Sequence, residues 1–587
     1  MHKRLWLLVG AAAAIVVIVA TSATATTKVA GSAKGAESAA APFSESWAQV
    51  PRTTAGRKAK NILVFGEEQD INGFNVDLSC CNQLAGNFLG AAETLRGAFV
   101  QNQKGLWVKD LVSSASATKT SLTYVIKPNA NWYWGGKKLP VTYKDFVFTL
   151  QQIDNPANDL AGRTGYSNID TKNWTHKGQK QITFHWKTTN CTTDFPCGPY
   201  ANWQSLFSGA AAIFPSAALV GQDFNKMWTN CICGSDGQPV SDGPFYLSNY
   251  TKGQGTTLKA NPFWAGKKPG LAEVDFKIIT DTNTEVQAMR GGEVDAITPT
   301  FGSNLLPLKG QSGLVFNQIP GYYFEHLEFR ETKGSSNPLL RAPWMRQAIA
   351  LGIDRQGIIK TVYGDLAGNT KPMNNMIYYS TQAQYKQDFA PFNYNPAKAL
   401  ALLKKHCTGG PASPGAGGTW TCAGYPATFR WSWTSGNATR QNTEAIVKSE
   451  MKDIGISLTE YPRAANVIFG PTGIPGGDFD IAEFAEITSG DPGDWYDVWR
   501  CGGDSNYTGY CSTKASKLMS AGNAELDPAK RAADFQAADK LMSAGVPVFP
   551  LYQRPTPLIY KSGITGMVNN PGTTGPFWNI EDWKWKS

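Results

Sequence analysis

The stretch YVIKPNANWYWGGKKLPVTYKDFV, residues 124–147, contains in order the patterns of a strand, a turn and the start of a helix. Its first residues complete an alternating apolar run, which predicts a strand, and the two consecutive glycines predict a tight turn. Thr142 and Asp145 have the spacing of a capping box, with Asp in place of Glu, and Phe146 and Leu150 begin the apolar face of a helix. The stretch therefore predicts a strand–turn–helix unit.

The same alternation of strands and helices extends on both sides of this unit. The pairs Asn395-Pro396 and Asp527-Pro528 each place a capping residue before a proline in a first helical turn. Mixed strands and helices with long loops predict an α/β protein. Further strands are predicted over residues 61–65, 256–260 and 273–279.

The composition limits the class of protein. A chain of 587 residues is too long for one hydrophobic core, so two or three lobes are expected, and 42% hydrophobic and 17% charged residues exclude a disordered chain. The formal charge of +9 comes from 55 basic and 46 acidic residues without a long basic run. We therefore expect no nucleic acid partner.

The N-terminus predicts export. Lys3 and Arg4 precede an uncharged run over residues 5–27 that is apolar at first and then rich in small residues. Residues 1–25 are expected to be a signal peptide or an uncleaved anchor, because the run is long enough to cross a hydrocarbon core of about 30 Å. Residues 26–57 are rich in Ala, Ser, Lys and Gly and predict a flexible tether. We therefore expect an exported protein, periplasmic or at the cell surface, where an uncleaved segment would tether it.

The ten cysteines agree with an oxidising compartment. Neither Cys80-Cys81 nor Cys231 and Cys233 close easily on themselves, so cross-pairing between these two segments is predicted, with the connectivity open. The alternative is a four-thiolate zinc site, but oxidising conditions favour disulfides. The six other cysteines form three close pairs, each expected to close one loop: Cys191 with Cys197, Cys407 with Cys422, and Cys501 with Cys511.

Signatures of catalysis are missing from the sequence. It contains no Gly-x-Ser-x-Gly, P-loop, Gly-x-Gly-x-x-Gly or His-Glu-x-x-His motif, and its five histidines have no ligand spacing. The carboxylates at residues 491, 494 and 497 do not have the alternate spacing of an EF-hand. We therefore expect no enzyme, metal or cofactor, and the alternative is a secreted glycan or peptide hydrolase whose acidic pair comes from distant residues.

A family resemblance emerges from motifs in a fixed order. The strand–turn–helix unit is followed by SDGPFYL at 241–247, NPFWAGKK at 261–268, RGGEVDA at 290–296 and RQAIALGIDRQGII at 346–359. Together with the two Pro-capped helices, they resemble the extracytoplasmic solute-binding proteins of the dipeptide and oligopeptide type, family 5, which serve ABC importers. The resemblance covers almost the whole chain between residues 61 and 552.

The resemblance implies a fold. It is a two-lobed periplasmic-binding-protein fold of the α/β class, with crossover strands and an extra subdomain inserted in the first lobe. One crossover strand is expected at residues 321–325, and the strand that leads the chain back to the first lobe is expected near residue 551. The implied boundaries are lobe I over 58–87 and 231–320, the inserted subdomain over 88–230, lobe II over 321–550, and a return to lobe I over 551–587.

The resemblance also implies a function. Closure of the lobes captures a small polar ligand, most simply a short peptide, and a monomer delivers it to an ABC permease in the membrane without a cofactor. Alternatives with the same fold are the binding of an oligosaccharide or another amine or cation, and a surface receptor.

The position of the ligand's charge partner departs from the family pattern. Peptide-binding members of the family have an Asp just before a loop in the second lobe, and that Asp pairs with the peptide's ammonium group. The matching loop of this chain contains Asp491-Pro492. Alignment on Asp491 places Thr488 at that position, or Ser489 with one gap, and a hydroxyl cannot neutralise a buried ammonium group. Glu483 and Glu486 are displaced alternatives that face opposite sides of a strand. Glu486 is favoured because it lies nearer the loop.

Aromatic and polar residues complete the candidate site. Trp431 and Trp433 share one face of a predicted strand, so one of them is expected in the cleft, with a core position as the alternative for both. Glu68 follows the first strand, where family members supply polar contacts, and Tyr322 lies on the expected crossover. The candidate ligand contacts are Glu68, Tyr322, Trp431, Trp433, Glu483, Glu486, Thr488 and Asp491.

Overall fold

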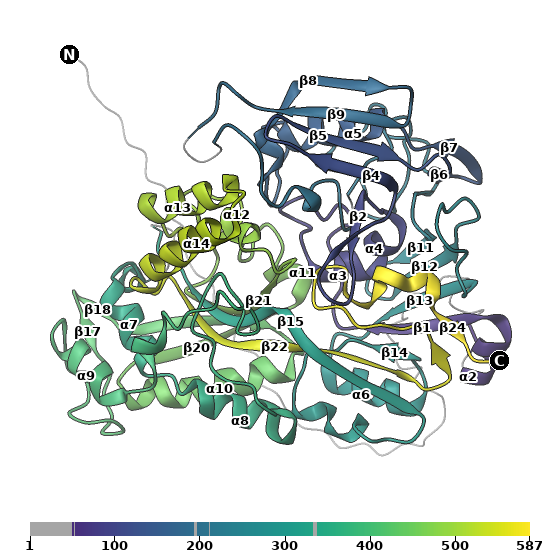
Figure 1. Ribbon diagram of the computed structural model, residues 1–587. Helices are drawn as coiled ribbons and strands as arrows, with labels where there is room; N and C mark the ends of the chain where they lie inside the picture. Colours follow the sequence, from purple (N-terminus) through teal and green to yellow (C-terminus); the bar gives the residue numbers. More distant parts are fainter. Residues whose placement is uncertain (1–49, 52, 193–195, 211, 333–336) are drawn as a thin grey trace, which may run out of the picture.

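A ten-stranded sheet forms the centre of the computed structural model, which describes residues 50–51, 53–192, 196–210, 212–332 and 337–587. Two adjacent inner strands, β22 and β15, are the longest of the sheet and pair antiparallel along their length, side by side across the middle of Figure 1. The strand order is β11 (Phe245–Thr251), β12 (Gly255–Ala260), β13 (Glu273–Ile278), β1 (Ile62–Glu67), β14 (Ala296–Ile297), β22 (Val548–Lys561), β15 (Leu314–Phe329), β21 (Ile481–Ile487), β19 (Thr428–Thr434) and β20 (Ser457–Arg463).

The long strands β15 and β22 divide the sheet into two halves. The first half comprises β11, β12, β13, β1 and β14, and β22 pairs with it through β14. The second half comprises β21, β19 and β20, and β15 pairs with it through β21. The predicted α/β class and crossover strands are confirmed, and the crossover at residues 321–325 falls within β15.

The decisive strand–turn–helix stretch folds as predicted. Strand β5 (Ser121–Ile126) leads through β6 (Asn131–Trp134) and β7 (Lys137–Pro140) to α5 (Tyr143–Asp154), whose N-terminus has a capping box made by Thr142 and Asp145. A four-stranded sheet carries this helix, in the order β4 (Val112–Ala117), β5, β9 (Gln181–Trp186) and β8 (Ile169–Lys177). We call residues 112–186 the β4–β9 unit, and it lies at the top of Figure 1.

Smaller elements complete the first half. The first described helix, α2 (Thr54–Lys60), begins inside the stretch expected to be a tether, and buried Arg57 pairs with Asp295 at 2.6 Å. Residues 50, 51 and 53 of the expected tether are also described, and residues 1–49 and 52 lie outside the described residues. The other elements are α3 (Leu84–Gly86), the π-helical turn η1 (Asn87–Ala91), α4 (Ala92–Thr94), α6 (Thr282–Gly291), β2 (Phe99–Gln101), β3 (Trp107–Lys109), β10 (Val240–Ser241), β23 (Ile564–Thr565) and β24 (Lys584–Trp585).

Helices cover the second half. Asn395 and Asp527 cap α9 and α14 as predicted, each followed by a proline in the first turn. The elements are α7 (Pro343–Leu351), α8 (Arg355–Tyr363), α9 (Pro396–Lys404), α10 (Ala438–Asp453), α11 (Ala465–Ile468), α12 (Tyr496–Trp499), α13 (Thr513–Ala524), α14 (Pro528–Ser543), β16 (Cys407–Thr408), β17 (Thr421–Cys422) and β18 (Tyr425–Pro426). Among the described residues, no helix has the length and apolar character needed to cross a membrane.

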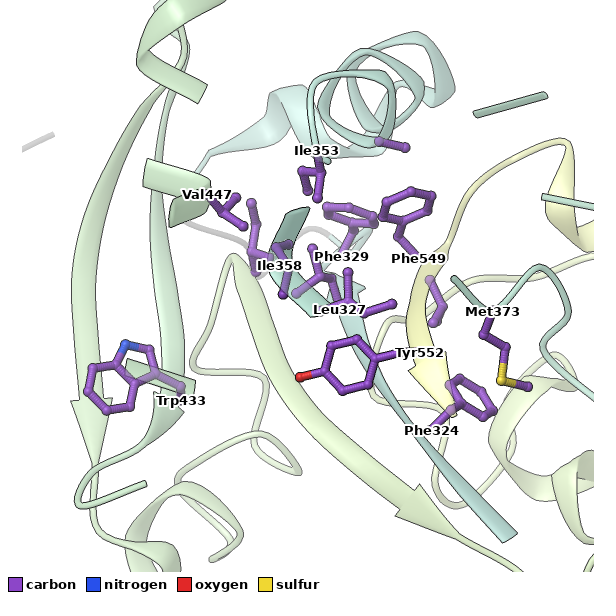
Figure 2. Packing of buried hydrophobic residues seen from close by; sticks show 14 of the residues in the cluster. Phe324, Leu327, Phe329, Ile353, Ile358, Met373, Trp433, Val447, Phe549 and Tyr552 are labelled. Carbon is purple, nitrogen blue, oxygen red and sulfur yellow. The ribbon is translucent and has the colours of Figure 1, made fainter. Parts of the chain in front are cut away.

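Two large hydrophobic cores underlie the two halves. One joins Phe65 of β1 with Tyr124 and Phe184 of the β4–β9 unit and with Phe577 and Trp583 near the C-terminus. The other fills the second half around β15 and β22, where Figure 2 shows Phe324, Phe329, Phe549 and Tyr552 together, and extends to Val64 of β1 and Met289 of α6 in the first half. The β4–β9 unit therefore shares its core with the first half.

All ten cysteines lie in the described residues and form disulfides, so no thiolate remains for a zinc site. The three predicted loop closures, Cys191–Cys197, Cys407–Cys422 and Cys501–Cys511, are confirmed. The predicted cross-pairing is wrong, because Cys80 pairs with Cys81 and Cys231 with Cys233. The two segments are nevertheless close, since the Phe74 amide donates to the Trp228 carbonyl at 2.8 Å. The distance between the two segments therefore does not explain why they are not cross-linked. Each pair instead closes within its own local turn.

Candidate functional site

A cavity of about 200 Å³ lies between the two halves where β15 and β22 pass from one to the other. The crossing strands contribute Tyr323 and Arg554 to its wall. The first half contributes residues 67–69, 79, 82–85, 87–88, 298–300, 572–573 and 575–576, and the second half contributes Arg440, Phe469, Pro475, residues 484–487 and Tyr507. A ligand bound in the cavity would therefore contact both halves of the protein.

Carboxylates line part of this wall. Glu67 ends β1, and burial together with the charge of Glu68 raises its pKa to about 8. Glu486 comes from β21, where burial and, next, the charge of Glu328 raise its pKa to about 7. Glu68 accepts hydrogen bonds from Thr300 at 2.8 Å from the amide and 2.6 Å from the hydroxyl. Burial is the largest cause of both raised pKa values, so it disfavours the charged forms of Glu67 and Glu486.

Two guanidinium groups also line the cavity. Arg440 of α10 donates from Nε to Glu325 Oε1 at 2.6 Å, and Arg554 of β22 donates from Nη1 to Glu325 Oε2 at 3.1 Å. Burial acts to raise the pKa of Glu325, but the charges of Arg440 and Arg554 lower it below its usual value. Two positive groups share one negative group, so this part of the wall carries a net positive charge.

The arrangement suits a ligand that carries both charge signs. A buried anion needs a cationic or hydrogen-bonding partner, and a buried cation needs a carboxylate. Aromatic side chains at Phe88, Phe469 and Phe484 supply apolar contact beside these groups. The described residues contain no cluster of His, Cys, Asp and Glu side chains that could hold a metal ion.

The two predicted glutamates of β21, Glu483 and Glu486, lie on opposite faces of the strand, as their odd spacing predicts. Glu68 and Glu486 line the cavity, whereas Glu483 is completely buried on the opposite face of β21. The Glu483 carboxylate accepts a hydrogen bond from Trp431 Nε1 at 3.2 Å, and burial holds its pKa well above its usual value. Glu483 is therefore a core residue without access to the cavity.

The two predicted tryptophans belong to the core of the second half. Trp431 is completely buried and Trp433 is 5% exposed, and neither lines the cavity. The expectation that one of them faces the cleft is therefore wrong. Both share a strand face as predicted, but β19 is an inner strand between β20 and β21, with α10 packed on it. Figure 2 shows Trp433 as part of this core.

Three other predicted contacts, Tyr322, Thr488 and Asp491, are not on the cavity wall. The half-buried Tyr322 ring packs close to Gly105 and Gly490, while the next residue, Tyr323, lines the cavity. The Thr488 hydroxyl is hydrogen-bonded to the Tyr379 hydroxyl at 2.8 Å. Asp491 forms two hydrogen bonds with Arg531, at 2.8 and 2.6 Å. Thr488 and Asp491 are thus satisfied by protein groups.

Sequence reasoning missed the central ion-pair group of Arg440, Glu325 and Arg554. These residues are 115 and 229 positions apart, and no local pattern marks any of them. Glu67 was also missed, although its place beside Glu68 at the end of a predicted strand was a usable signal.

Comparisons with known proteins agree with this architecture. The profile of the family described as bacterial extracellular solute-binding proteins, family 5 Middle, matches residues 107–508. The oligopeptide-binding protein OppA of Mycobacterium tuberculosis is 26% identical over 493 residues, which cover 82% of this chain and 77% of the relative.

Solved structures show the same fold at low identity. The oligopeptide-binding protein AppA of Bacillus subtilis, in complex with a nonapeptide, has a TM-score of 0.77 at 20% identity, covering 90% of this chain and 99% of the other. NikZ of Campylobacter jejuni, in complex with Ni(L-His), has a TM-score of 0.75 at 17% identity, covering 89% and 99%. Because these proteins hold different ligands in one fold, the ligand has to be argued from the cavity itself.

Proposed function

The chain belongs to family 5 of the bacterial extracellular solute-binding proteins, and on that premise we propose that it captures a short peptide between its halves and delivers it to an ABC permease. It acts outside the cytoplasm, as a monomer, and performs no covalent chemistry. An uncleaved N-terminal segment would keep it at the membrane. The name of the relative OppA supports an oligopeptide ligand.

One observation carries the proposal: the cavity wall contains both guanidinium groups and carboxylates. A peptide has an ammonium group at one end and a carboxylate at the other. Arg440 and Arg554 suit the peptide's carboxylate, because guanidinium and carboxylate groups form strong, charge-assisted hydrogen bonds. The peptide's two end groups are thus complementary in charge to the two kinds of charged group on the wall.

We assign the peptide's ammonium group to Glu486. It is the one carboxylate among the described residues that line the cavity from the second half. Thr488, one of the two residues that align with the family's Asp, already has Tyr379 as its partner. Glu68 and Glu67 approach from the first half, so an ammonium group between them and Glu486 attracts both halves and favours the closed form.

Retained ligand provides the most direct test. Native mass spectrometry of protein purified without denaturation should release short peptides, whereas a neutral sugar would overturn the proposal. Calorimetry with trialanine adds a charge test. N-acetyl-trialanine lacks the ammonium group and trialanine amide lacks the carboxylate, so each should bind at least about tenfold more weakly than trialanine. Equal binding of all three would contradict the charge assignment.

A further inference from the structure

One of several contacts between the first and second halves lies outside the ligand cavity. It joins the loop between α5 and β8, in the β4–β9 unit, to the segment from α12 onward in the second half. None of residues 161–164 or 497–505 lines the cavity. The two sides also belong to different hydrophobic cores, because Trp495 and Trp499 flank Asp497 in the second core while the β4–β9 unit shares the first.

The Asp497 side chain is the centre of this contact. Its Oδ2 atom accepts three hydrogen bonds: from the amides of Arg163 and Thr164, both at 2.9 Å, and from the Thr164 hydroxyl at 2.6 Å. Its Oδ1 atom accepts from Arg500 Nε at 2.9 Å, within the second half. Asp497 is 5% exposed, and its two carboxylate oxygens thus bond to opposite sides of the contact, Oδ2 to the β4–β9 unit and Oδ1 to the second half.

Neighbouring groups extend the same contact. Arg163 forms an ion pair with Asp504 at 2.9 Å, and Ser505 donates from its hydroxyl to the Ala161 carbonyl at 2.6 Å. The fit is close, because a Cβ atom on Gly162 would lie 2.9 Å from Asp497 Oδ2. A partly buried carboxylate that accepts several donors is strongly stabilised, and all three donors are lost if the two bodies separate.

We propose that Asp497 is a positioning residue for ligand capture: it joins the β4–β9 unit to the second half and holds the closed form without touching the ligand. The β4–β9 unit then has a role in closure. The proposal goes beyond the peptide assignment, since any ligand that needs the closed form gains affinity from it. Apparent affinity scales with the closed fraction that is already populated.

Two substitutions break the contact from opposite sides. Asp497→Asn places an amide N–H either against the donors of Arg163 and Thr164 or against Arg500, whichever way the side chain turns. Gly162→Ala leaves Asp497 unchanged but fills the space in which its carboxylate sits. The matched controls are Asp527→Asn, at the exposed cap of α14, and Gly291→Ala, where an added Cβ has open space.

The first measurement needs no ligand. Small-angle scattering of protein stripped of retained ligand should show a larger radius of gyration for Asp497→Asn and Gly162→Ala than for the wild type and both controls. Hydrogen exchange at the Arg163 and Thr164 amides should rise about tenfold in Asp497→Asn. Superimposable scattering curves and unchanged exchange would overturn the proposal.

The second measurement uses trialanine and separates positioning from general destabilisation. Trialanine should dissociate about tenfold faster from both variants, with little change in its association rate. The double variant should be no worse than the weaker-binding single variant, since both act on one contact, whereas independent damage would add. If the wild type fails to bind trialanine, the peptide assignment fails while scattering and exchange still decide the role of Asp497.

Discussion

Arg440 and Glu325 form a buried ion pair, 2.6 Å from Nε to Oε1, that ties α10 of the second half to the crossing strand β15. The Glu325 carboxylate simultaneously holds Arg554 on β22. One acidic side chain therefore fixes both cationic groups of the cavity wall, and it does so on the two strands that connect the halves.

Glu325→Gln should therefore destabilise the protein strongly. Removal of one member of a buried ionic group leaves uncompensated charge and costs about 3–5 kcal/mol. Urea denaturation would show it as a lower midpoint. Glu460→Gln is the matched control, because it breaks an exposed pair with Lys448 and should cost about 0.5 kcal/mol or less. Equal costs for the two variants would contradict the buried ion-pair network.

Arg554→Lys should weaken binding of trialanine by about tenfold or more. Lysine keeps the positive charge but lacks the planar fork that matches a carboxylate. Trialanine amide has no carboxylate, so its affinity should change much less. If both ligands lose affinity equally in calorimetry, Arg554 acts on the cavity's shape and not on the ligand's carboxylate.

Ligand affinity should rise with pH. The pKa of Glu486 is raised to about 7 in the free protein, so a cationic ligand must bind the deprotonated minority at lower pH. Trialanine affinity should increase from about pH 5.5 to about pH 7.5. Glu486→Gln should bind weakly and without this pH dependence in calorimetry. If the affinity of Glu486→Gln for trialanine still depended on pH as in the wild type, another group would be responsible for the titration.

Stability of the ligand-free protein should fall over a similar range. The pKa of Glu67 rises from 4.5 to about 8 on folding, so the folded state favours its protonated form. That contribution is fully present below 4.5 and is lost as the pH rises through about 8. Glu67→Gln should flatten the decline in urea denaturation midpoints. A decline as steep as that of the wild type would exclude Glu67 as its source.

The Cys80–Cys81 disulfide should matter more for binding than for stability. It closes no loop of chain, but Ser79, Asn82 and Gln83 beside it line the cavity. Replacing both cysteines by serine should weaken trialanine binding and leave the unfolding midpoint nearly unchanged. The Cys407–Cys422 pair, 15 residues apart, provides the control: its loss should cost about 3 kcal/mol and leave affinity intact. The reverse pattern would contradict this role.

Local signals predicted most of the fold. The capping box at Thr142 and Asp145 and the Pro-capped helices at Asn395 and Asp527 depend on residues a few positions apart, and all three occur as expected. The motif order then gave the α/β arrangement with crossover strands.

The site was harder to predict because its partners are far apart in sequence. Strand alternation correctly put Trp431 and Trp433 on one face and Glu483 and Glu486 on opposite faces, but alternation cannot say which face meets the cavity. The pairing of Glu325 with its two arginines depends on strand β22, which joins the sheet near the end of the chain.

The core of the first half contains Leu558, Phe577, Ile580 and Trp583 together with Phe65 and Phe276. The first and last parts of the chain thus share one hydrophobic core, although the residues of the second half are synthesised between them. During synthesis, the rings of Phe65 and Phe276 stay uncovered by Phe577 and Trp583 until about the final thirty residues are made. A ribosome-bound or C-terminally truncated chain would leave these rings without that cover, so the second half, whose described core needs nothing beyond β22, can complete its folding first.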